Sequence, residues 1–574
     1  MTAGLEGPEP GVGSVPDAAP DMDPDTSSDG PDAPDAADAA PDATFDTAPD
    51  RAGDPTPPSS EPPPPPPPDP WLRVSRPFDR ARVGEVPVDD APEVEAAVQT
   101  AREAQLGWGG LEPRQRVRHL AALRREIARW TDDIVDRIVA ETGKPDDEAL
   151  VEVFMVQRFL RWTERHAPAI LADRRVPTGW MPRRRARIWR EPLGVVGVIS
   201  PWNYPFILSM EPVAAALACG NAAVLKPSEH TPFTGALVRE LAEDAGLPSG
   251  LVQVVQGRAA TGRALVQAGL DHLHFTGGPD TARAILADAA PLLLPTSLEL
   301  GGKDPALVLA DANLERAARG IAFGALSNAG QTCLATERVY VEERVHERFL
   351  RILVRVVSEL RVGSGGDIDV GPMTLDSQLE HVERQVNDAV GRGARVLCGG
   401  ERIDPASNVF LPTVLADVPD SAQILREETF GPVIPVVSVA DVDEAIRRAN
   451  AHPMGLFASI WTGNVARGRR LARALDCGGV SINDTLSHWG AVALPFGGRG
   501  ESGASRLRGE EGLHTLSRSK AVLERRGGGR SEPWWFPYGP RSRRFLRAGL
   551  GLETYGGIRG LMAALVRALR REET

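Results

Sequence analysis

Between residues 195 and 276, short apolar runs alternate with longer helical patterns, and this alternation constrains the fold more than any other feature of the chain. Strands in a parallel sheet are buried on both faces, so they read as uninterrupted apolar runs joined by helices. We therefore predict an α/β fold with a helix-wrapped parallel sheet and a ligand site at its carboxyl edge. The apolar runs are 195–200, 222–226, 251–256 and 272–276, and the helical patterns are 205–218, 232–246 and 260–268.

Further helical patterns lie on both sides of this region. Thr231 is the predicted N-cap of the helix over 232–246, with Pro232 in its first turn. A second α/β stretch is expected from about 300 to 485. After a strand-like start at Trp71, the earlier helices are expected at 91–106 and 112–142, and the later ones near 313–327, 345–360, 376–392 and 441–450.

The net charge of −13 belongs to an N-terminal tail. Residues 1–70 hold 16 Asp and Glu, one basic residue and 20 of the 50 prolines, a local net charge of −15. Residues 71–574 then carry 64 Lys and Arg against 62 Asp and Glu, a net charge of +2. The tail is predicted to be disordered, because it cannot bury enough apolar surface to fold. The nearly neutral remainder argues against a nucleic-acid partner, which requires clustered positive charge.

The chain carries few features of a secreted or membrane-spanning protein. It has no basic and apolar leader pattern at its start and no run of 18 apolar residues. Its four cysteines form no Cys-x-x-Cys pair, which excludes a disulfide scaffold and predicts a reducing compartment, the cytoplasm. These cysteines are Cys219, Cys333, Cys398 and Cys477.

The C-terminal segment 531–574 has its own character. It combines aromatic residues with several arginines and ends in a helical pattern over about 557–571, with leucines on one face. Two interpretations stay open. In the first, the helix contacts a membrane surface or gates a substrate site. In the second, it packs against its own protein.

Three polar residues stand where side chains can project into a cleft. Cys333 follows a glycine-containing turn, Glu299 comes directly before two glycines, and Asn203 lies between two prolines just after the first apolar run. An amide at that place can donate to a developing oxyanion. Each residue alone also fits a plainer interpretation, as a buried cysteine, a turn carboxylate and a turn asparagine.

Two more motifs complete the pattern. Residues 226–229, Lys-Pro-Ser-Glu, follow the second apolar run, where a carboxylate can accept hydrogen bonds from ribose hydroxyls. Residues 427–432 read Glu-Glu-Thr-Phe-Gly-Pro. The chain has 61 arginines and only four lysines, yet Lys226 and Lys303 both fall inside these motifs. A lysine in a chain that otherwise uses arginine indicates a specific role.

In this order, the five motifs resemble those of the aldehyde dehydrogenase superfamily, over residues 71–525. The match also includes 275–278, Phe-Thr-Gly-Gly, and 494–498, Leu-Pro-Phe-Gly-Gly. The resemblance implies an α/β aldehyde dehydrogenase-like fold, with a parallel Rossmann-type cofactor domain, an α/β catalytic domain and a disordered N-terminal tail. The implied divisions are a tail over 1–70, the NAD-binding domain over 71–299 with an oligomerisation element near 183–192, the catalytic domain over 300–485, an oligomerisation and return segment over 486–530, and an extension over 531–574.

The resemblance also implies a mechanism. Cys333 attacks the aldehyde carbon, and the amide of Asn203 and the backbone N–H of Cys333 hold the oxyanion of the thiohemiacetal. Loss of hydride leaves a thioester, which is hydrolysed by water that Glu299 activates. Family members that pass the acyl group to coenzyme A or phosphate typically lack this base, so Glu299 favours release as the carboxylic acid.

NAD is the implied cofactor, with NADP as the alternative, because the carboxylate of Glu229 would repel a 2′-phosphate. The motif departs from the family at Gly278, where serine is expected, and at Ala282, where a glycine is expected. No metal site is expected. The implied cofactor-binding residues are Trp202, Lys226, Ser228, Glu229, Gly257, Gly262, Thr276, Gly277, Gly278, Glu428 and Phe430.

The substrate is predicted to be an apolar aldehyde, long-chain or aromatic, because Tyr204, Ile207 and Leu334 accompany the nucleophile. The alternatives are a semialdehyde, a carotenoid-type aldehyde, or a catalytically silent scaffold with the same fold. The resemblance further implies a homodimer or homotetramer.

Overall fold

The computed structural model describes residues 69–562, apart from 179, 180, 182, 528, 529, 558 and 561. The disorder predicted for 1–70 and most of the helix predicted over 557–571 lie outside the described residues. Within them, the C-terminal segment forms a helix before the predicted one, α15 (Pro540–Tyr555), which begins at a proline in its first position. Proline suits that position because its missing N–H would have no partner there. None of the described helices is long and apolar enough to cross a membrane.

The predicted parallel sheet is confirmed. Five parallel strands lie in the order β7-β6-β5-β8-β9. The register pairs Ile199 with both Lys226 and Phe275, and it pairs Thr276 with Glu299. The carboxyl ends of neighbouring strands therefore bring the sequence motifs to one edge of the sheet. The strands are β5 (Val195–Ile199), β6 (Ala222–Lys226), β7 (Val252–Val254), β8 (His272–Gly277) and β9 (Thr296–Leu300).

Helices pack around this sheet, and they differ from the predicted helices in two places. The single helix expected over 112–142 is two helices that meet at Trp130. The helix α4 was missed. The helices are α1 (Ala91–Gly109), α2 (Pro113–Arg129), α3 (Thr131–Thr142), α4 (Asp146–Ile170), α5 (Ile207–Ala218), α6 (Pro232–Asp244), α7 (Ala259–Gln267) and α8 (Pro279–Ala289).

The N-terminus of α6 is capped by a distant carboxylate. Thr231 occupies the N-cap position as predicted, but its hydroxyl makes no cap hydrogen bond. Glu141 of α3 instead accepts from the backbone N–H groups of Phe233 and Thr234, each at 2.8 Å. A buried carboxylate at this end also meets the positive end of the helix dipole. The cap was therefore predicted at the right residue but by the wrong side chain.

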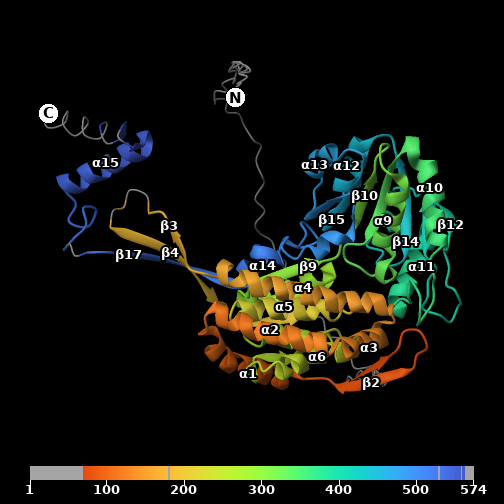
Figure 1. The fold of residues 1–574 in the computed structure, drawn as a ribbon, viewed down its shortest axis with the longest axis horizontal. Coiled ribbons are helices and arrows are strands. Elements are labelled where there is room, and N and C mark those ends of the chain that lie inside the picture. Colours follow the sequence, from red (N-terminus) through yellow and green to blue (C-terminus); the bar gives the residue numbers. More distant parts are fainter. Residues whose placement is uncertain are drawn as a thin grey trace, which may run out of the picture. The chain divides into compact units, whose positions relative to one another are not determined.

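A second sheet has seven strands in the order β12-β13-β14-β11-β10-β15-β16, and only the β12–β13 pair is antiparallel. Helices α9 and α10 pack on each other and on β11 and β14 (Figure 1). The strands are β10 (Asp304–Val308), β11 (Thr336–Glu342), β12 (Arg395–Cys398), β13 (Thr413–Ala416), β14 (Val433–Val439), β15 (Phe457–Trp461) and β16 (Gly479–Ile482). The helices are α9 (Leu314–Leu326), α10 (Glu343–Ser358), α11 (Asp376–Gly391), α12 (Val442–Asn450) and α13 (Val465–Ala472).

Each large sheet has its own apolar core. Two smaller antiparallel sheets complete the described chain, one joining β1 to β2 and one in the order β17-β4-β3. The second sheet includes the 183–192 element as strand β4, which pairs with β17, a strand far later in the chain. Their elements, with the neighbouring helix, are β1 (Trp71–Ser75), β2 (Arg82–Pro87), β3 (Arg174–Val176), β4 (Arg184–Pro192), α14 (Gly509–Thr515) and β17 (Ser517–Arg525).

Candidate active site

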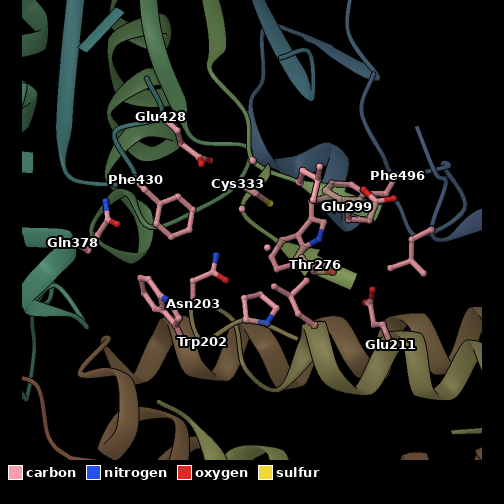
Figure 2. Close-up of a pocket in the computed structure, with 18 of the residues that line it drawn as sticks. Trp202, Asn203, Glu211, Thr276, Glu299, Cys333, Gln378, Glu428, Phe430 and Phe496 are labelled. Atoms are coloured by element: carbon pink, nitrogen blue, oxygen red, sulfur yellow. The ribbon is translucent and has the colours of Figure 1, made fainter. Parts of the chain in front are cut away.

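A cavity of about 460 Å³ lies at the carboxyl ends of β8 and β9. It has the size of a small-molecule site. It brings together all three predicted catalytic residues, as Figure 2 shows for Cys333, Glu299 and Asn203. Of the predicted cofactor residues, those that line it are Trp202, Thr276, Gly277, Gly278, Glu428 and Phe430. Those outside its lining are Lys226, Ser228, Glu229, Gly257 and Gly262.

Cys333 stands at the end of an unusual turn. Asn328 and Ala329 have positive φ angles of 55° and 53°, and Gly330 follows at 74°. A Cβ atom on Gly330 would lie 2.1 Å from the carbonyl oxygen of Gly431, so only glycine fits there. Residues with side chains rarely adopt this left-handed region, and strain of this kind persists only where surrounding contacts hold it.

Those contacts come from amide and carboxylate side chains. Asn328 Nδ2 donates to the Gln331 carbonyl oxygen at 3.1 Å, and Gln331 Nε2 donates back to the Asn328 carbonyl oxygen at 2.9 Å. Gln331 Oε1 accepts from the backbone N–H of Thr374 at 2.9 Å, and Glu148 accepts from that of Asn328 at 2.6 Å. The turn is therefore fixed from both sides before the chain reaches Cys333.

Asn203 reaches the same turn from the loop after β5. Its Nδ2 donates to the carbonyl oxygen of Gln331, two residues before Cys333, at 2.9 Å. The backbone carbonyl oxygen of Asn203 accepts from Lys144 Nζ at 2.7 Å and from Asn328 Nδ2 at 2.8 Å. The amide is buried and aimed at the backbone that carries the thiol. This is the position from which it can donate to an oxyanion formed on that thiol.

Two buried Lys–Glu pairs hold the cavity walls. Lys144 Nζ lies 2.7 Å from Glu152 Oε1, and Glu152 Oε2 accepts from the backbone N–H of Phe206 at the start of α5. Lys303 Nζ lies 2.5 Å from Glu337, which accepts from the backbone N–H of Phe430. Buried charges require such partners. Both lysines are among the four in the chain, but Lys144 lies in none of the sequence motifs.

Replacing Glu152 with alanine is expected to destabilise the protein by about 3 kcal/mol or more, because it leaves the Lys144 ammonium buried without its carboxylate. Thermal unfolding at a fixed heating rate measures the change. The control is Glu315→Ala, which removes exposed ion pairs with Arg319 and Arg355 and should cost about 1 kcal/mol at most. Equal losses in the two variants would contradict the role given to the Lys144–Glu152 pair.

Electrostatics at Cys333 disfavour its thiolate. Burial raises the pKa of the thiol, and the nearby carboxyl groups of Glu428, Asp304 and Glu299 raise it further. The resting nucleophile is therefore a neutral thiol. A base or a positive charge in the cavity would favour the thiolate.

Glu299 is a buried carboxyl group with unused hydrogen-bonding capacity. Neither of its side-chain oxygens has a hydrogen-bond partner among the described residues. Burial raises its pKa well above the ordinary value, and the positive charges of Arg506 and Arg508 offset part of that rise. An unpartnered carboxyl group on a cavity wall is suited to taking up water and a proton from it.

Aromatic and acidic side chains form the opposite wall. The rings of Trp202 and Phe430 meet edge to face, with centroids 5.7 Å apart. Glu428 Oε1 accepts from the backbone N–H of Gly302 at 3.1 Å, and a Cβ on Gly301 would lie 2.3 Å from Glu428 Oε2. Burial and the nearby Glu337 raise the pKa of Glu428 to about 8. The glycine lets this carboxyl group approach the strand end.

The remaining predicted cofactor residues form a separate group around the end of β6. Lys226 Nζ lies 3.9 Å from Glu229, and a Cβ on Gly262 would touch the stem of Lys226. Burial lowers the pKa of Lys226, and Glu229 counteracts this. Gly257 adopts a φ of 158°, with Thr261 Oγ1 2.0 Å from where its Cβ would lie. Ser228 Oγ accepts from the backbone N–H of His230 at 3.3 Å.

Several lining residues were missed by sequence reasoning. Gln378 donates to the Thr429 carbonyl oxygen at 2.8 Å, and His381 lies 3.1 Å from that of Glu428. Both stand on one face of α11, where helical spacing reads only as an amphipathic pattern. Among the described residues, no group of three or more His, Cys, Asp or Glu side chains is placed to hold a metal ion. The other missed residues are Leu208, Glu211, Ser377, Arg384, Trp489, Leu507 and Arg508, whereas Phe496 lies within the 494–498 motif.

Comparison with known proteins shows the family to which the chain belongs. The 4,4'-diapolycopene aldehyde oxidase of a Methylomonas species is 42% identical over 465 residues, covering 80% of this chain and 87% of that protein. A putative succinate-semialdehyde dehydrogenase [NADP(+)] 2 of Mycobacterium tuberculosis is 35% identical, covering 81% and 91%. A crystal structure of a Mycobacterium tuberculosis aldehyde dehydrogenase complexed with NAD+ aligns with a TM-score of 0.75 at 31% identity, covering 79% and 94%. The model of the Aldehyde dehydrogenase family matches residues 68–522, so this chain belongs to the aldehyde dehydrogenase family.

Proposed function

We propose that this protein oxidises an apolar aldehyde to the carboxylic acid with NAD(P). One observation carries the proposal, which is that Cys333, Glu299 and Asn203, drawn from three distant parts of the sequence, meet in one cavity. A nucleophile, a base and an oxyanion donor are the groups that aldehyde oxidation with hydrolytic release requires. A silent scaffold would have no chemical need for all three.

The residues present fit a dinucleotide. Gly278 precedes α8, and a Cβ there would meet open space, so the N-terminus of that helix can accept a pyrophosphate. Glu428 would hold the nicotinamide ribose and Phe430 would pack beside the ring, while Lys226 and Glu229 would hold the adenosine ribose. When bound, the nicotinamide supplies the acceptor for the hydride.

The chain's own residues supply the other steps. The Cys333 thiol first loses its proton to water in the cavity. The thiolate then adds to the aldehyde carbon, and the Asn203 amide and the backbone N–H of Cys333 donate to the oxyanion that forms. After hydride has left, the carbon is held as a thioester on Cys333. Glu299 then takes a proton from water, which attacks the thioester, and the acid leaves with the thiol restored.

NAD is the proposed preferred cofactor over NADP. The Glu229 carboxylate lies beside Lys226 and would repel a 2′-phosphate. Ala282 stands where the family pattern has a glycine, yet it is buried in α8 and leaves Gly278 open. This departure does not obstruct the helix N-terminus.

An apolar substrate is supported by the wall beyond the catalytic residues. Leu208, Trp489, Phe496 and Leu507 line it. The similar 4,4'-diapolycopene aldehyde oxidase acts, by its name, on a carotenoid-type aldehyde, which belongs to this apolar class. The similarity to a putative succinate-semialdehyde dehydrogenase makes a semialdehyde the second candidate. The residues on which the sequence analysis based an apolar substrate were Tyr204, Ile207 and Leu334. All three are buried in the apolar cores, and none lines the cavity.

Substrate profiling tests the proposal. Reduced nicotinamide is followed by absorbance with NAD or NADP and with short aliphatic, long-chain, aromatic and semialdehyde substrates. Long-chain or aromatic aldehydes with NAD are expected to give the highest kcat/KM. Absence of turnover with every aldehyde, from folded protein, would favour the scaffold interpretation, and a highest value with a semialdehyde would favour the second candidate.

Replacing Asn203 with alanine is expected to lower kcat about 10²–10³-fold, the usual loss when one oxyanion donor is removed. KM should change little, because the amide acts on the oxyanion more than on the bound aldehyde. Steady-state kinetics at saturating NAD measures both constants. An unchanged kcat would remove Asn203 from the mechanism.

We also propose that the protein is a homodimer or homotetramer through the β17-β4-β3 sheet. Strand β4 pairs with β17 over nine residues, and the exposed edge of such a sheet can pair with another chain. Light scattering on the full chain measures the oligomer. A monomer would contradict this assignment.

The segment around α15 is the proposed contact with an anionic membrane surface, for a protein expected in the cytoplasm. It exposes Phe536, Tyr538 and Leu550, each more than 60% accessible. Helix α15 has four exposed arginines and one acidic residue, so its charge complements anionic lipid. The arginines are Arg541, Arg543, Arg544 and Arg547.

Sedimentation with vesicles tests this contact. The full chain should bind vesicles containing phosphatidylserine, and changing Phe536, Tyr538 and Leu550 to serine should reduce binding about tenfold or more, since three buried apolar contacts are lost. The matched control changes Leu106 and Leu293, two exposed leucines elsewhere, to serine. Binding that is absent from the full chain, or equal in both variants, would contradict the contact.

A further inference from the structure

A buried ion pair that the mechanism does not use forms part of the cavity wall. Glu211 comes from α5 and Arg508 from the loop before α14, 297 residues apart in the chain. Arg508 Nε donates to Glu211 Oε2 at 2.7 Å and Arg508 Nη2 donates to Oε1 at 2.9 Å. Both side chains are about 2–3% exposed. Paired, two-bond geometry of this kind is the strongest that an arginine makes with a carboxylate.

Aromatic rings enclose the guanidinium. It lies 5.2 Å from the ring centroid of Trp489 and 5.7 Å from that of Phe496, and its Nη1 donates to the Trp489 carbonyl oxygen. Arg508 also has a positive φ of 67°. The backbone therefore accepts an unfavourable conformation to place this side chain in the wall.

The pair lies on the substrate side of the cavity. In the view of Figure 2, Glu211 and Gln378 stand on opposite sides of Cys333. Gln378 shares α11 with the exposed Arg384 and lies on the side of Phe430 and Glu428, where the nicotinamide is proposed to bind. Glu211 instead lies on the side of Phe496, and its partner Arg508 lies against the rings of Trp489 and Phe496, two of the apolar residues proposed to hold the substrate.

The pairing leaves this wall without a free positive charge. Arg508 is the one arginine on the substrate side of the described cavity lining, and Glu211 occupies two of its donor groups. Arg506 is nearby but donates to the carbonyl oxygens of Gly498 and Ser505 and is not part of the lining. An aldehyde with a distal carboxylate would meet a guanidinium already neutralised, and would meet the like charge of Glu211.

We propose that Glu211 is a specificity-determining residue, which selects uncharged aldehydes by neutralising Arg508 and rejects aldehydes that carry a carboxylate at the far end. This inference rests on the proposed function, since it concerns the same cavity. It also separates the two substrate candidates, because the carboxylate of a semialdehyde would need a cation to bind it, and Glu211 neutralises the arginine of this wall.

Replacing Glu211 with glutamine tests the inference in the full chain. Glutamine keeps the size of the side chain and removes its charge, so Arg508 becomes available to a substrate carboxylate. Succinate semialdehyde and butanal have equal carbon chains and differ in that carboxylate. The ratio of their kcat/KM values should shift at least about tenfold toward the semialdehyde, mainly through KM, as a new charge-assisted hydrogen bond predicts.

Two controls accompany this variant. Glu211→Gln combined with Arg508→Gln removes the freed cation and should return the ratio to that of the wild type. Glu164→Gln removes a partly buried partner of Arg124 outside the cavity and should leave the ratio unchanged. A shift in the Glu164 variant, or its persistence in the double variant, would overturn the role of Arg508.

Failure of the inference and failure of the proposed function give different results. Absence of turnover of every aldehyde by the wild type contradicts the function. Turnover with an unchanged ratio in folded Glu211→Gln contradicts the inference alone. A wild type that prefers succinate semialdehyde to butanal contradicts the inference and also favours the second substrate candidate. If Glu211→Gln does not fold, Glu211→Leu with Arg508→Met removes both charges and is expected to keep the wild-type preference. A reversed preference in that variant would count against the inference.

Discussion

Replacing Cys333 with alanine is expected to lower kcat/KM for aldehyde oxidation by about 10⁴-fold or more. Its thiol is the one nucleophilic sulfur in the described lining of the cavity. Without it there is no covalent adduct from which hydride can leave and no thioester to hydrolyse. Steady-state absorbance of the reduced nicotinamide measures the loss, and binding of NAD should persist.

The other cysteines provide the matched control. Cys398 is half-buried on β12, and Cys477 lies near β16, where burial raises the pKa of its thiol to about 12. Neither lines the cavity. Cys398→Ala is therefore expected to keep full activity. Residual activity of Cys333→Ala within tenfold of the wild type would show that another group forms the adduct.

Replacing Glu299 with glutamine is expected to separate the two halves of the reaction. Steady-state turnover should fall about 10²–10⁴-fold, the usual contribution of a general base. The first turnover should persist, because adduct formation and hydride loss need Cys333 and Asn203 rather than this carboxyl group. Stopped-flow absorbance should then show a burst of reduced nicotinamide close to one equivalent per site, followed by a slow phase.

The pH dependence of this variant provides its control. Burial raises the pKa of Glu299, and its basic form carries the hydrolysis, so the wild-type hydrolysis rate should rise with pH as that proton is lost and fall as pH decreases. The slow phase of Glu299→Gln should lose this dependence. A variant that loses the burst as well as the steady state would place Glu299 in the first half-reaction.

The sheet that carries the site could be predicted from the sequence because its strands are local and uniformly apolar. The runs over 195–200, 222–226 and 272–276 correspond to β5, β6 and β8. Once parallel, their register alone brings Ile199, Lys226 and Phe275 to the same edge. Periodicity therefore led to the edge where the motifs meet.

The contacts that hold the site could not be predicted in the same way. The pairs Lys144–Glu152 and Glu211–Arg508 bury opposite charges from separate elements, and charge in a sequence normally indicates a solvated surface. Only the scarcity of lysine pointed to Lys144. No sequence signal pointed to Arg508, because the chain uses arginine throughout.

Backbone strain was also outside the reach of pattern reasoning. Asn328 and Ala329 precede Cys333 with positive φ angles, although alanine favours helix and strand regions. Gln331 donates to the Asn328 carbonyl oxygen within the turn, and Glu148 of α4, the helix that was missed, accepts from the Asn328 N–H. The nucleophile could be identified from its motif, but the turn that presents it depends on tertiary contacts.

The central claim, that the aldehyde carbon is held on Cys333 and released by Glu299, is tested most directly by the mass of the protein after one turnover. Glu299→Gln is mixed with NAD and an apolar aldehyde, quenched in acid, and examined intact and as peptides. The account predicts one acyl group per chain on the peptide containing Cys333, in amounts equal to the reduced nicotinamide formed. Reduced nicotinamide without an acyl adduct, or an adduct on Cys219, Cys398 or Cys477, would contradict it.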